Sequence, residues 1–402
     1  MNAPKLLFLF LQATIGTSPY TSFAGNGQYA FADGTATEAR LNQPTGLALS
    51  ADGGTLFFGE NYGQRVRQVD ISTGVVSTLA GGGSIRVNNI WRTPCGGNSD
   101  EECLGTETSF SSVYDMAVSA DALNLFVSEN HRIRQIEIST GAVKVLAGAQ
   151  SASGHYIDSI GTAARFNEPG GLAVSADGQT LFVTEVTGHR IRQIDIPTRT
   201  VTTLAGESDT SHVFWQYHKG IAGSANGIGT AAQFNKPSGL ALSADGLALF
   251  LADRDNHIIR RIVIESRVVT TFAGLAGMSG FADGLGTAAR FERPDGLAMS
   301  ADGLTLFVVD YHSPDGHGLV RQIAISTGAV TTLAGEYDNL LIGIAASDAA
   351  LYVTAIYRHR ILKVDAHIHV SPPRSCPAHA RALPTSIALY THATSPVQPR
   401  DA

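Results

Sequence analysis

The 402-residue chain has little of several residue types, and each shortage excludes a class of protein. Three cysteines are too few for a small domain held together by disulfides. Cys95 and Cys103 lie close together in the sequence and are either a local disulfide or two free thiols, while Cys376 stands alone. Five lysines and a net charge of −7 disfavour nucleic acid as the main partner. No apolar run is long enough to span a membrane.

What the chain does have is a repeat. A strand-like phrase that closes on Ala-Gly recurs at intervals of 56 to 68 residues. Its copies end at Gly25, Gly81, Gly148, Gly206, Gly274 and Gly335. A unit of this size is one supersecondary element that buries its apolar face only against its neighbours.

Each unit is predicted to form four short antiparallel strands. In the first unit they are residues 46–50, 55–58, 65–71 and 75–79, separated by turns such as Ala51-Asp-Gly53 and Ser72-Thr-Gly74. Alternation with a period of two between such turns is typical of half-buried strands. Four-stranded units repeated radially form a β-propeller, so the fold class is all-β.

The number of units predicts six blades. The last unit has three strands, whereas the N-terminal copy, residues 20–25, is a fourth strand without the preceding three. We expect this N-terminal strand to complete the last blade and close the ring, which covers an exposed strand edge. The alternative is that residues 386–390 of the tail supply the missing strand.

The units resemble NHL repeats. The features that carry the resemblance are an acid after the second strand, an Asn/His-Arg-Ile-Arg segment and the closing Leu-Ala-Gly, as in Glu129-Asn-His-Arg-Ile-Arg134. The resemblance covers about residues 18–370 and implies the same propeller fold. That family includes RNA-binding, protein-binding, adhesive and metal-dependent lyase members, so the resemblance does not select a function.

Two polar columns recur together in five units. A carboxylate ends the second strand and an arginine lies in the third, whereas the sixth unit has Ala355 and Leu362 instead. Joint presence and joint loss predict buried ion pairs with a structural role, because a single unpaired charge inside a blade is costly. The predicted pairs are Glu60 with Arg67, Glu129 with Arg134, Glu185 with Arg192, Asp253 with Arg260, and Asp310 with Arg321.

The innermost strands begin with small residues, which lets them converge around a narrow channel. Asp115 and Asp295 depart from this pattern in blades two and five, which are opposite each other in a six-membered ring. Both carboxylates are therefore expected at one end of the channel. They are either solvated or ligands of a divalent cation such as calcium, and no other cofactor is indicated.

Four histidines occupy corresponding positions between second and third strands. They are His131, His189, His257 and His359. Residues related by the ring stand too far apart to share one ion, so we expect them to be loop or ion-pair partners instead of metal ligands.

Two connections between blades are long and contain the two tryptophans. Residues 82–104 include Trp91, and residues 207–224 include Phe214, Trp215, Tyr217 and His218. Both follow a fourth strand and emerge on one face. Large aromatic side chains in loops on a rigid scaffold are typical of a protein-binding surface, although the same residues could pack down and shield the channel.

The two ends of the chain have different compositions from the repeats. Residues 1–17 are either a short secretory signal or a lead-in segment, so a secreted or cell-surface location is predicted as readily as a cytoplasmic one. Residues 371–402 are rich in proline, alanine and threonine and are expected to be disordered.

The leading functional hypothesis is a non-catalytic scaffold whose inter-blade loops bind a protein or another macromolecule. Its basis is that the repeated polar residues suit a structural role, while the singular residues are aromatic. The alternative is a metal-dependent propeller enzyme, resembling the lactonases or the amidating lyases, with its site at the channel mouth. RNA binding ranks third, because it needs a basic face.

Overall fold

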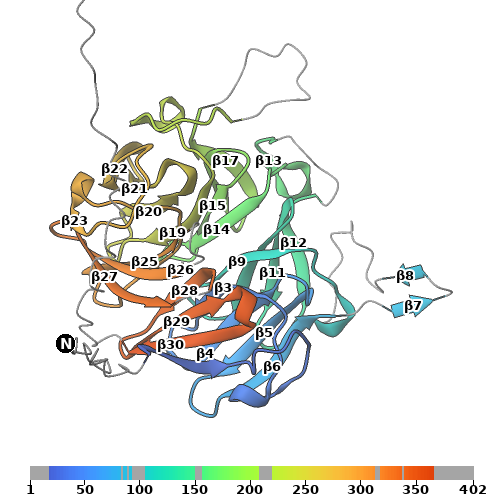
Figure 1. Ribbon diagram of the computed structural model, residues 1–402. Helices are drawn as coiled ribbons and strands as arrows, with labels where there is room; N and C mark the ends of the chain where they lie inside the picture. Colours follow the sequence, from blue (N-terminus) through green and yellow to red (C-terminus); the bar gives the residue numbers. More distant parts are fainter. Residues whose placement is uncertain are drawn as a thin grey trace, which may run out of the picture. The chain divides into compact units, whose positions relative to one another are not determined.

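The structure is a computed structural model that describes residues 18–82, 85–87, 90–92, 105–149, 156–207, 220–312, 317–336 and 339–365. Six antiparallel sheets follow one another around a ring (Figure 1). The predicted all-β, six-bladed propeller is confirmed. The helices of the described residues are 3-10 turns of three residues, and none is long and apolar enough to cross a membrane.

Each blade runs outward from an inner strand. Blade one consists of β3 (Pro44–Leu49), β4 (Thr55–Glu60), β5 (Arg65–Asp70) and β6 (Val75–Gly81). Blade two consists of β9 (Val113–Val118), β10 (Asn124–Glu129), β11 (Arg132–Glu137) and β12 (Val143–Gly148). Blade three consists of β14 (Pro169–Val174), β15 (Thr180–Glu185), β16 (Arg190–Asp195) and β17 (Thr200–Ala205).

The second half of the ring repeats this order. Blade four consists of β19 (Pro237–Leu242), β20 (Ala248–Asp253), β21 (Ile258–Val263) and β22 (Val268–Gly274). Blade five consists of β24 (Pro294–Met299), β25 (Thr305–His312), β26 (His317–Ala324) and β27 (Ala329–Glu336). Blade six consists of β28 (Leu341–Ala346), β29 (Ala350–Ala355), β30 (Arg360–Asp365) and β1 (Tyr20–Ala24).

The N-terminal strand closes the ring, as predicted. β1 pairs antiparallel with β30, with Tyr20 opposite Val364 and Ser22 opposite Leu362. In Figure 1 the red strands of blade six lie beside the blue strands of blade one. The rival strand in residues 386–390 and the predicted end segments 1–17 and 371–402 lie outside the described residues.

Four blades carry one short additional strand that the sequence did not predict. These strands pair with the outermost strand of blades one, three, four and five, respectively: β2 (Gly34–Thr35), β13 (Ser159–Ile160), β18 (Gly227–Ile228) and β23 (Gly284–Leu285). Between blades one and two, β7 (Ile85–Val87) and β8 (Ile90–Arg92) form a separate hairpin.

The hydrophobic core lies between adjacent blades. Period-two alternation gives each strand two apolar faces, so that Phe126 of blade two packs in one cluster with Leu181 and Val183 of blade three. The inner strands approach so closely that a Cβ on Gly343 would lie 2.5 Å from the carbonyl oxygen of Thr45 in the next blade. The small residues in this column are therefore required by packing around the axis.

The inter-blade connections end in apolar plugs. Short 3-10 turns lead to side chains that are completely buried between blades: Leu41, Phe166, Phe234 and Phe291. Phe110, which is 1% exposed, occupies the same position in blade two. Its segment Gly105-Thr-Glu-Thr-Ser-Phe110 shares only the glycine, the threonine and the aromatic residue with Gly161-Thr-Ala-Ala-Arg-Phe166 of the next connection.

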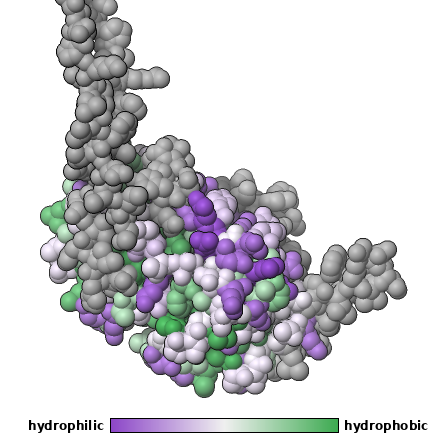
Figure 2. Space-filling view, turned by 60° about the horizontal axis from the view of Figure 1, so that its bottom comes forward, coloured by the Kyte–Doolittle hydropathy of each residue, from purple (hydrophilic) through white to green (hydrophobic). Residues whose placement is uncertain are grey.

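The propeller has two faces, which we define by their turns. The loop face carries the connections between blades and the turns between second and third strands. The opposite face carries the turns between first and second strands and between third and fourth strands. On the coloured surface shown in Figure 2, hydrophobic and hydrophilic residues are interspersed.

Candidate functional site

The structure brings each carboxylate of the repeated column to its arginine. The shortest nitrogen–oxygen distances are 3.0 Å for Glu60–Arg67, 3.0 Å for Glu129–Arg134, 2.8 Å for Glu185–Arg192, 2.9 Å for Asp253–Arg260 and 3.4 Å for Asp310–Arg321. All ten side chains are buried. In blade six the corresponding Ala355 and Leu362 are buried as an apolar pair.

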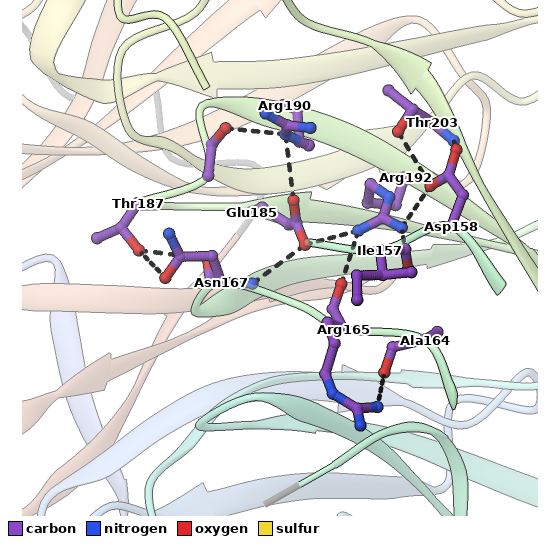
Figure 3. Close-up of polar contacts among 11 residues, drawn as sticks. Ile157, Asp158, Ala164, Arg165, Asn167, Glu185, Thr187, Arg190, Arg192 and Thr203 are labelled. Atoms are coloured by element: carbon purple, nitrogen blue, oxygen red, sulfur yellow. Dashed lines mark hydrogen bonds and ion pairs between the residues drawn. The ribbon is translucent and has the colours of Figure 1, made fainter. Parts of the chain in front are cut away.

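The pairs also hold the inter-blade connections, as blade three illustrates (Figure 3). Arg192 bonds to Glu185 through Nη1 and to Asp158 through Nη2, at 2.8 and 2.5 Å. The same two nitrogens donate to the carbonyl oxygens of Arg165 and Ile157, each at 3.1 Å. One guanidinium thus fastens the connection from the preceding blade to its own sheet.

The loop partner of the arginine recurs in four blades. Its members are Asp33, Asp158, Asn226 and Asp283. The sequence analysis did not identify these residues. Their spacing of 34 residues from the arginine in blades one, three and four is the signal that would have identified them.

Burial is the largest influence on the pKa of four of these carboxylates, Glu60, Glu185, Asp253 and Asp310. Desolvation raises the pKa of Glu185, and it raises the pKa of Asp253 and Asp310 to about 6, although the paired arginines act in the opposite direction. The ionised form of such a buried carboxylate is stabilised by the arginine paired with it. These contacts support a structural role for the five pairs.

Three of the four histidines contact the backbone of the next blade. The Nδ1 atom of His359 accepts a hydrogen bond from the amide of Gln43 at 3.2 Å, and that of His189 accepts one from Lys236 at 3.0 Å. His257 contacts the carbonyl oxygen of Glu292. These histidines connect neighbouring blades, and among the described residues no group of three or more His, Cys, Asp or Glu could hold a metal ion.

Asp115 and Asp295 lie on the inner strands of blades two and five, and the charge of Asp295 acts on Asp115. Asp115 accepts a hydrogen bond from the amide of Leu172 at 3.0 Å, and Asp295 lies 3.7 Å from Arg254. Burial, with a smaller contribution from the charge of Asp295, raises the pKa of Asp115 to about 7. A cation between these two carboxylates stays a prediction.

The aromatic residues that the sequence singled out cannot be placed. The backbone of Trp91 belongs to β8, but its side chain lies outside the described residues. Backbone and side chain both lie outside the described residues for Phe214, Trp215, Tyr217 and His218. Their role in binding also stays a prediction.

The structure shows a group of exposed tyrosines that the sequence analysis missed. Tyr62 and Tyr357, which are 63% and 62% exposed, lie in turns between second and third strands. Tyr29, which is 62% exposed, packs edge-on against His359 in one of these turns, and Tyr114, at 38%, is near the start of an inner strand. All four therefore lie on the loop face, over blades six, one and two.

A cluster of charges occupies another sector of the loop face. Lys236, Arg254 and Arg293 converge on Asp255, with shortest nitrogen–oxygen distances of 2.7, 3.5 and 3.4 Å. These residues come from the connections and turns of blades four and five. Lys236 and Arg293 occupy equivalent positions, directly before the proline that begins the inner strand, but blades one and three have Gln43 and Glu168 there, so no repeated charge identified them.

Comparisons with known proteins agree with this architecture. A family model described as the Teneurin NHL domain matches residues 25–263, so the chain belongs to the NHL-repeat family. The SUPPRESSOR OF QUENCHING 1 protein of Arabidopsis thaliana is 25% identical over 305 residues, which are 75% of this chain and 27% of that protein. NHL repeat-containing protein 2 of Homo sapiens is 30% identical over 167 residues, which are 40% of this chain and 22% of that protein. The chain thus matches about a quarter of the length of these relatives.

Solved structures share the fold at low sequence identity. An auxiliary nutrient binding protein of Bacteroides thetaiotaomicron has a TM-score of 0.60 and 14% identity, with 86% of this chain and 75% of that chain covered. A gluconolactonase of Xanthomonas campestris has a TM-score of 0.52 and 15% identity, with 86% and 89% covered. A binding protein and an enzyme are both among these neighbours, so the fold leaves the specific function open.

Proposed function

We propose that this NHL propeller is a non-catalytic binding scaffold and that its loop face recognises a protein partner. The observation that carries the proposal is the exposed group Tyr29, Tyr62, Tyr114 and Tyr357 on that face. Tyrosine supplies a large contact area with few rotatable bonds and one hydrogen-bonding group, and it is enriched at protein interfaces.

The anchoring of the described inter-blade connections supports the same conclusion. The arginines of four blades tie the inter-blade connections to the sheets through buried contacts, and histidines link neighbouring blades. A surface that is already ordered loses little conformational entropy when a partner binds. The repeated polar residues thus hold the scaffold, and the singular residues remain available for recognition.

A metal-dependent enzyme, resembling lactonases or amidating lyases, is the second candidate. The observation in its favour is Asp115, because a channel carboxyl with a pKa of about 7 is suited to proton transfer. It ranks lower because such sites use several converging ligands, whereas among the residues that the structure describes no group of three or more His, Cys, Asp or Glu could hold a metal ion.

Site-specific photocrosslinking in the source cells tests the binding proposal. A photoreactive phenylalanine analogue would replace Tyr62 or Tyr357 in turn, and replace Leu247, an exposed residue of the opposite face, as the control. We expect the two loop-face positions to capture the same protein and the control position not to capture it. Equal capture at all three positions, or capture at none, would contradict the proposal.

A matched pair of variants then checks the tyrosines themselves. Tyr62→Ala combined with Tyr357→Ala should weaken binding of the captured protein without lowering the melting temperature, because both side chains are largely exposed. Leu247→Ala combined with Leu304→Ala removes two similarly exposed apolar side chains from the opposite face and should leave binding unchanged.

A further inference from the structure

The loop face carries a second recognition region, which we call the basic sector: Lys236, Arg254 and Arg293 together with Leu275 and Met278. We propose that the basic sector binds an acidic segment of a protein partner, one that places a large apolar side chain next to its Asp or Glu residues. This inference rests on the proposed binding function and specifies the chemistry of the partner.

The first element of the sector is an excess of positive charge. In the ion pairs of the sector that involve Asp255 and Asp295, three cations share two carboxylates, because Arg254 contacts both of them, at 3.5 and 3.7 Å. Lys236 and Arg293 approach different oxygens of Asp255, at 2.7 and 3.4 Å, and their side chains are 40% and 41% exposed. Their ammonium and guanidinium groups therefore lie close together, with N–H donors left over for an incoming carboxylate.

The second element is apolar surface beside these charges. The amide of Gly277 donates a hydrogen bond to the carbonyl oxygen of Asn256 at 3.2 Å, which fixes the 275–278 turn against the turn that carries Arg254 and Asp255. Leu275 and Met278 in that turn are 40% and 53% exposed. A methionine on a binding surface adapts to apolar side chains of different shape.

The charge of the remaining surface favours an acidic partner at this sector. Five exposed aspartates ring the opposite face, one in the turn between first and second strands of each of blades one to five: Asp52, Asp121, Asp177, Asp245 and Asp302. A hydrogen bond from a serine hydroxyl lowers the pKa of each, so all five are ionised at neutral pH. An acidic segment is repelled there and attracted to the basic sector.

Selection from a random dodecapeptide phage library on the full chain tests this inference. We expect enriched peptides in which Asp or Glu adjoins Leu, Ile, Met or Phe. Synthetic versions should lose affinity at least about tenfold in the variant Lys236→Gln with Arg293→Gln, and should bind more weakly as salt concentration rises.

The control variant makes the same change in net charge elsewhere. Lys144→Gln with Arg261→Gln removes two exposed cations outside the sector and should leave peptide affinity within about twofold. Leu275→Ser with Met278→Ser should also weaken binding, which would separate apolar recognition from attraction to charge alone. Enrichment of basic peptides, or of none, would overturn the proposal.

Two further outcomes separate this inference from the proposed function. Peptides that lose affinity in Tyr62→Ala with Tyr357→Ala, but not in Lys236→Gln with Arg293→Gln, would refute the basic sector and leave the binding scaffold intact. Sedimentation of the chain alone is the second readout. Self-association that disappears in Lys236→Gln with Arg293→Gln would identify a second copy as the occupant and also overturn the proposal.

Discussion

Replacing Arg260 in blade four by leucine should destabilise the propeller by about 3–5 kcal/mol. Arg260 is completely buried and lies 2.9 Å from Asp253, which is also completely buried. The guanidinium additionally donates to the carbonyl oxygens of Gln233 and Ala225, each at 3.0 Å. Blade four suits the test because Ile258 lies opposite Asp253, in the place of the second arginine that blades one to three carry, and because Arg261 of the same strand is exposed.

The magnitude follows from the charge that the substitution leaves behind. Removing one member of a buried ion pair typically costs about 3–5 kcal/mol, since the remaining charge has lost both water and its partner. The freed carbonyl oxygens add about 1 kcal/mol each where water does not replace the arginine. Asp253 keeps hydrogen bonds from the amide of Asn235 and from Asn256, at 2.7 and 2.9 Å, which limits the loss.

The assay is urea unfolding of the full chain, followed by far-ultraviolet circular dichroism at pH 5 and pH 8. The pKa of Asp253, already raised to about 6 by burial, should rise further once the arginine that opposes this shift is gone. A carboxyl group whose pKa is higher in the folded state than in the unfolded state stabilises the protein at pH values below the unfolded pKa. This stabilisation is lost as the pH rises through the folded pKa. The cost of Arg260→Leu should therefore be larger at pH 8 than at pH 5.

The matched control is Asp253→Asn combined with Arg260→Leu, which removes both charges and keeps an acceptor for the two neighbouring donors. It should cost at least about 1 kcal/mol less than the single variant at pH 8 and show little difference between the two pH values. Blade six has the buried, uncharged Ala355 and Leu362 at these two positions, so a blade can fold without the ion pair. A single variant within 1 kcal/mol of the wild type, or a cost independent of pH, would refute the reasoning.

Four other predictions concern the channel, the inner strands and the closure of the ring. Asp115→Asn should raise the free energy of unfolding at pH 8 in the presence of EDTA by up to about 4 kcal/mol, and should give no gain at pH 3. The reason is that a folded-state pKa of about 7, against an ordinary 3.8, penalises the ionised form of Asp115. Urea unfolding at both pH values checks this. The predicted cation requires a stoichiometric metal that elemental analysis finds in the wild type and not in Asp115→Asn, and equal contents would remove the site. Gly239→Ala should lower the free energy of unfolding by about 1–3 kcal/mol, because its Cβ would overlap the carbonyl oxygen of Asp295. Deleting residues 1–24 should expose the edge of β30 and yield oligomers in light scattering.

Much of the architecture could be predicted because its causes are local. Alternation with a period of two, turns such as Ala51-Asp-Gly53, and a phrase repeated every 56 to 68 residues define strands and blades without knowledge of distant contacts. The same comparison of repeats predicted that the orphan strand near Tyr20 would complete blade six. The comparison of repeats also predicted that the carboxylate of the second strand pairs with the arginine of the third, since Ala355 and Leu362 replace both charges in one blade.

The candidate recognition surfaces could not be predicted in this way. Tyr62 and Tyr357 look like ordinary turn residues until the ring places blades six, one and two side by side. The basic sector is a stronger case, because Lys236, Asp255 and Arg293 are 19 and 38 residues apart, and the equivalents of the two cations in blades one and three are Gln43 and Glu168.

The sequence by itself determined the fold class, the number of blades, the closing strand and the charges that each blade contains. Only the tertiary structure decided which side chains share a face and which charges converge at one point. The physical reason is the distance along the chain over which each feature is determined. Strand patterns and turns depend on residues a few positions apart. The contact of Lys236 with Asp255 joins different segments and depends on how the blades pack around the axis.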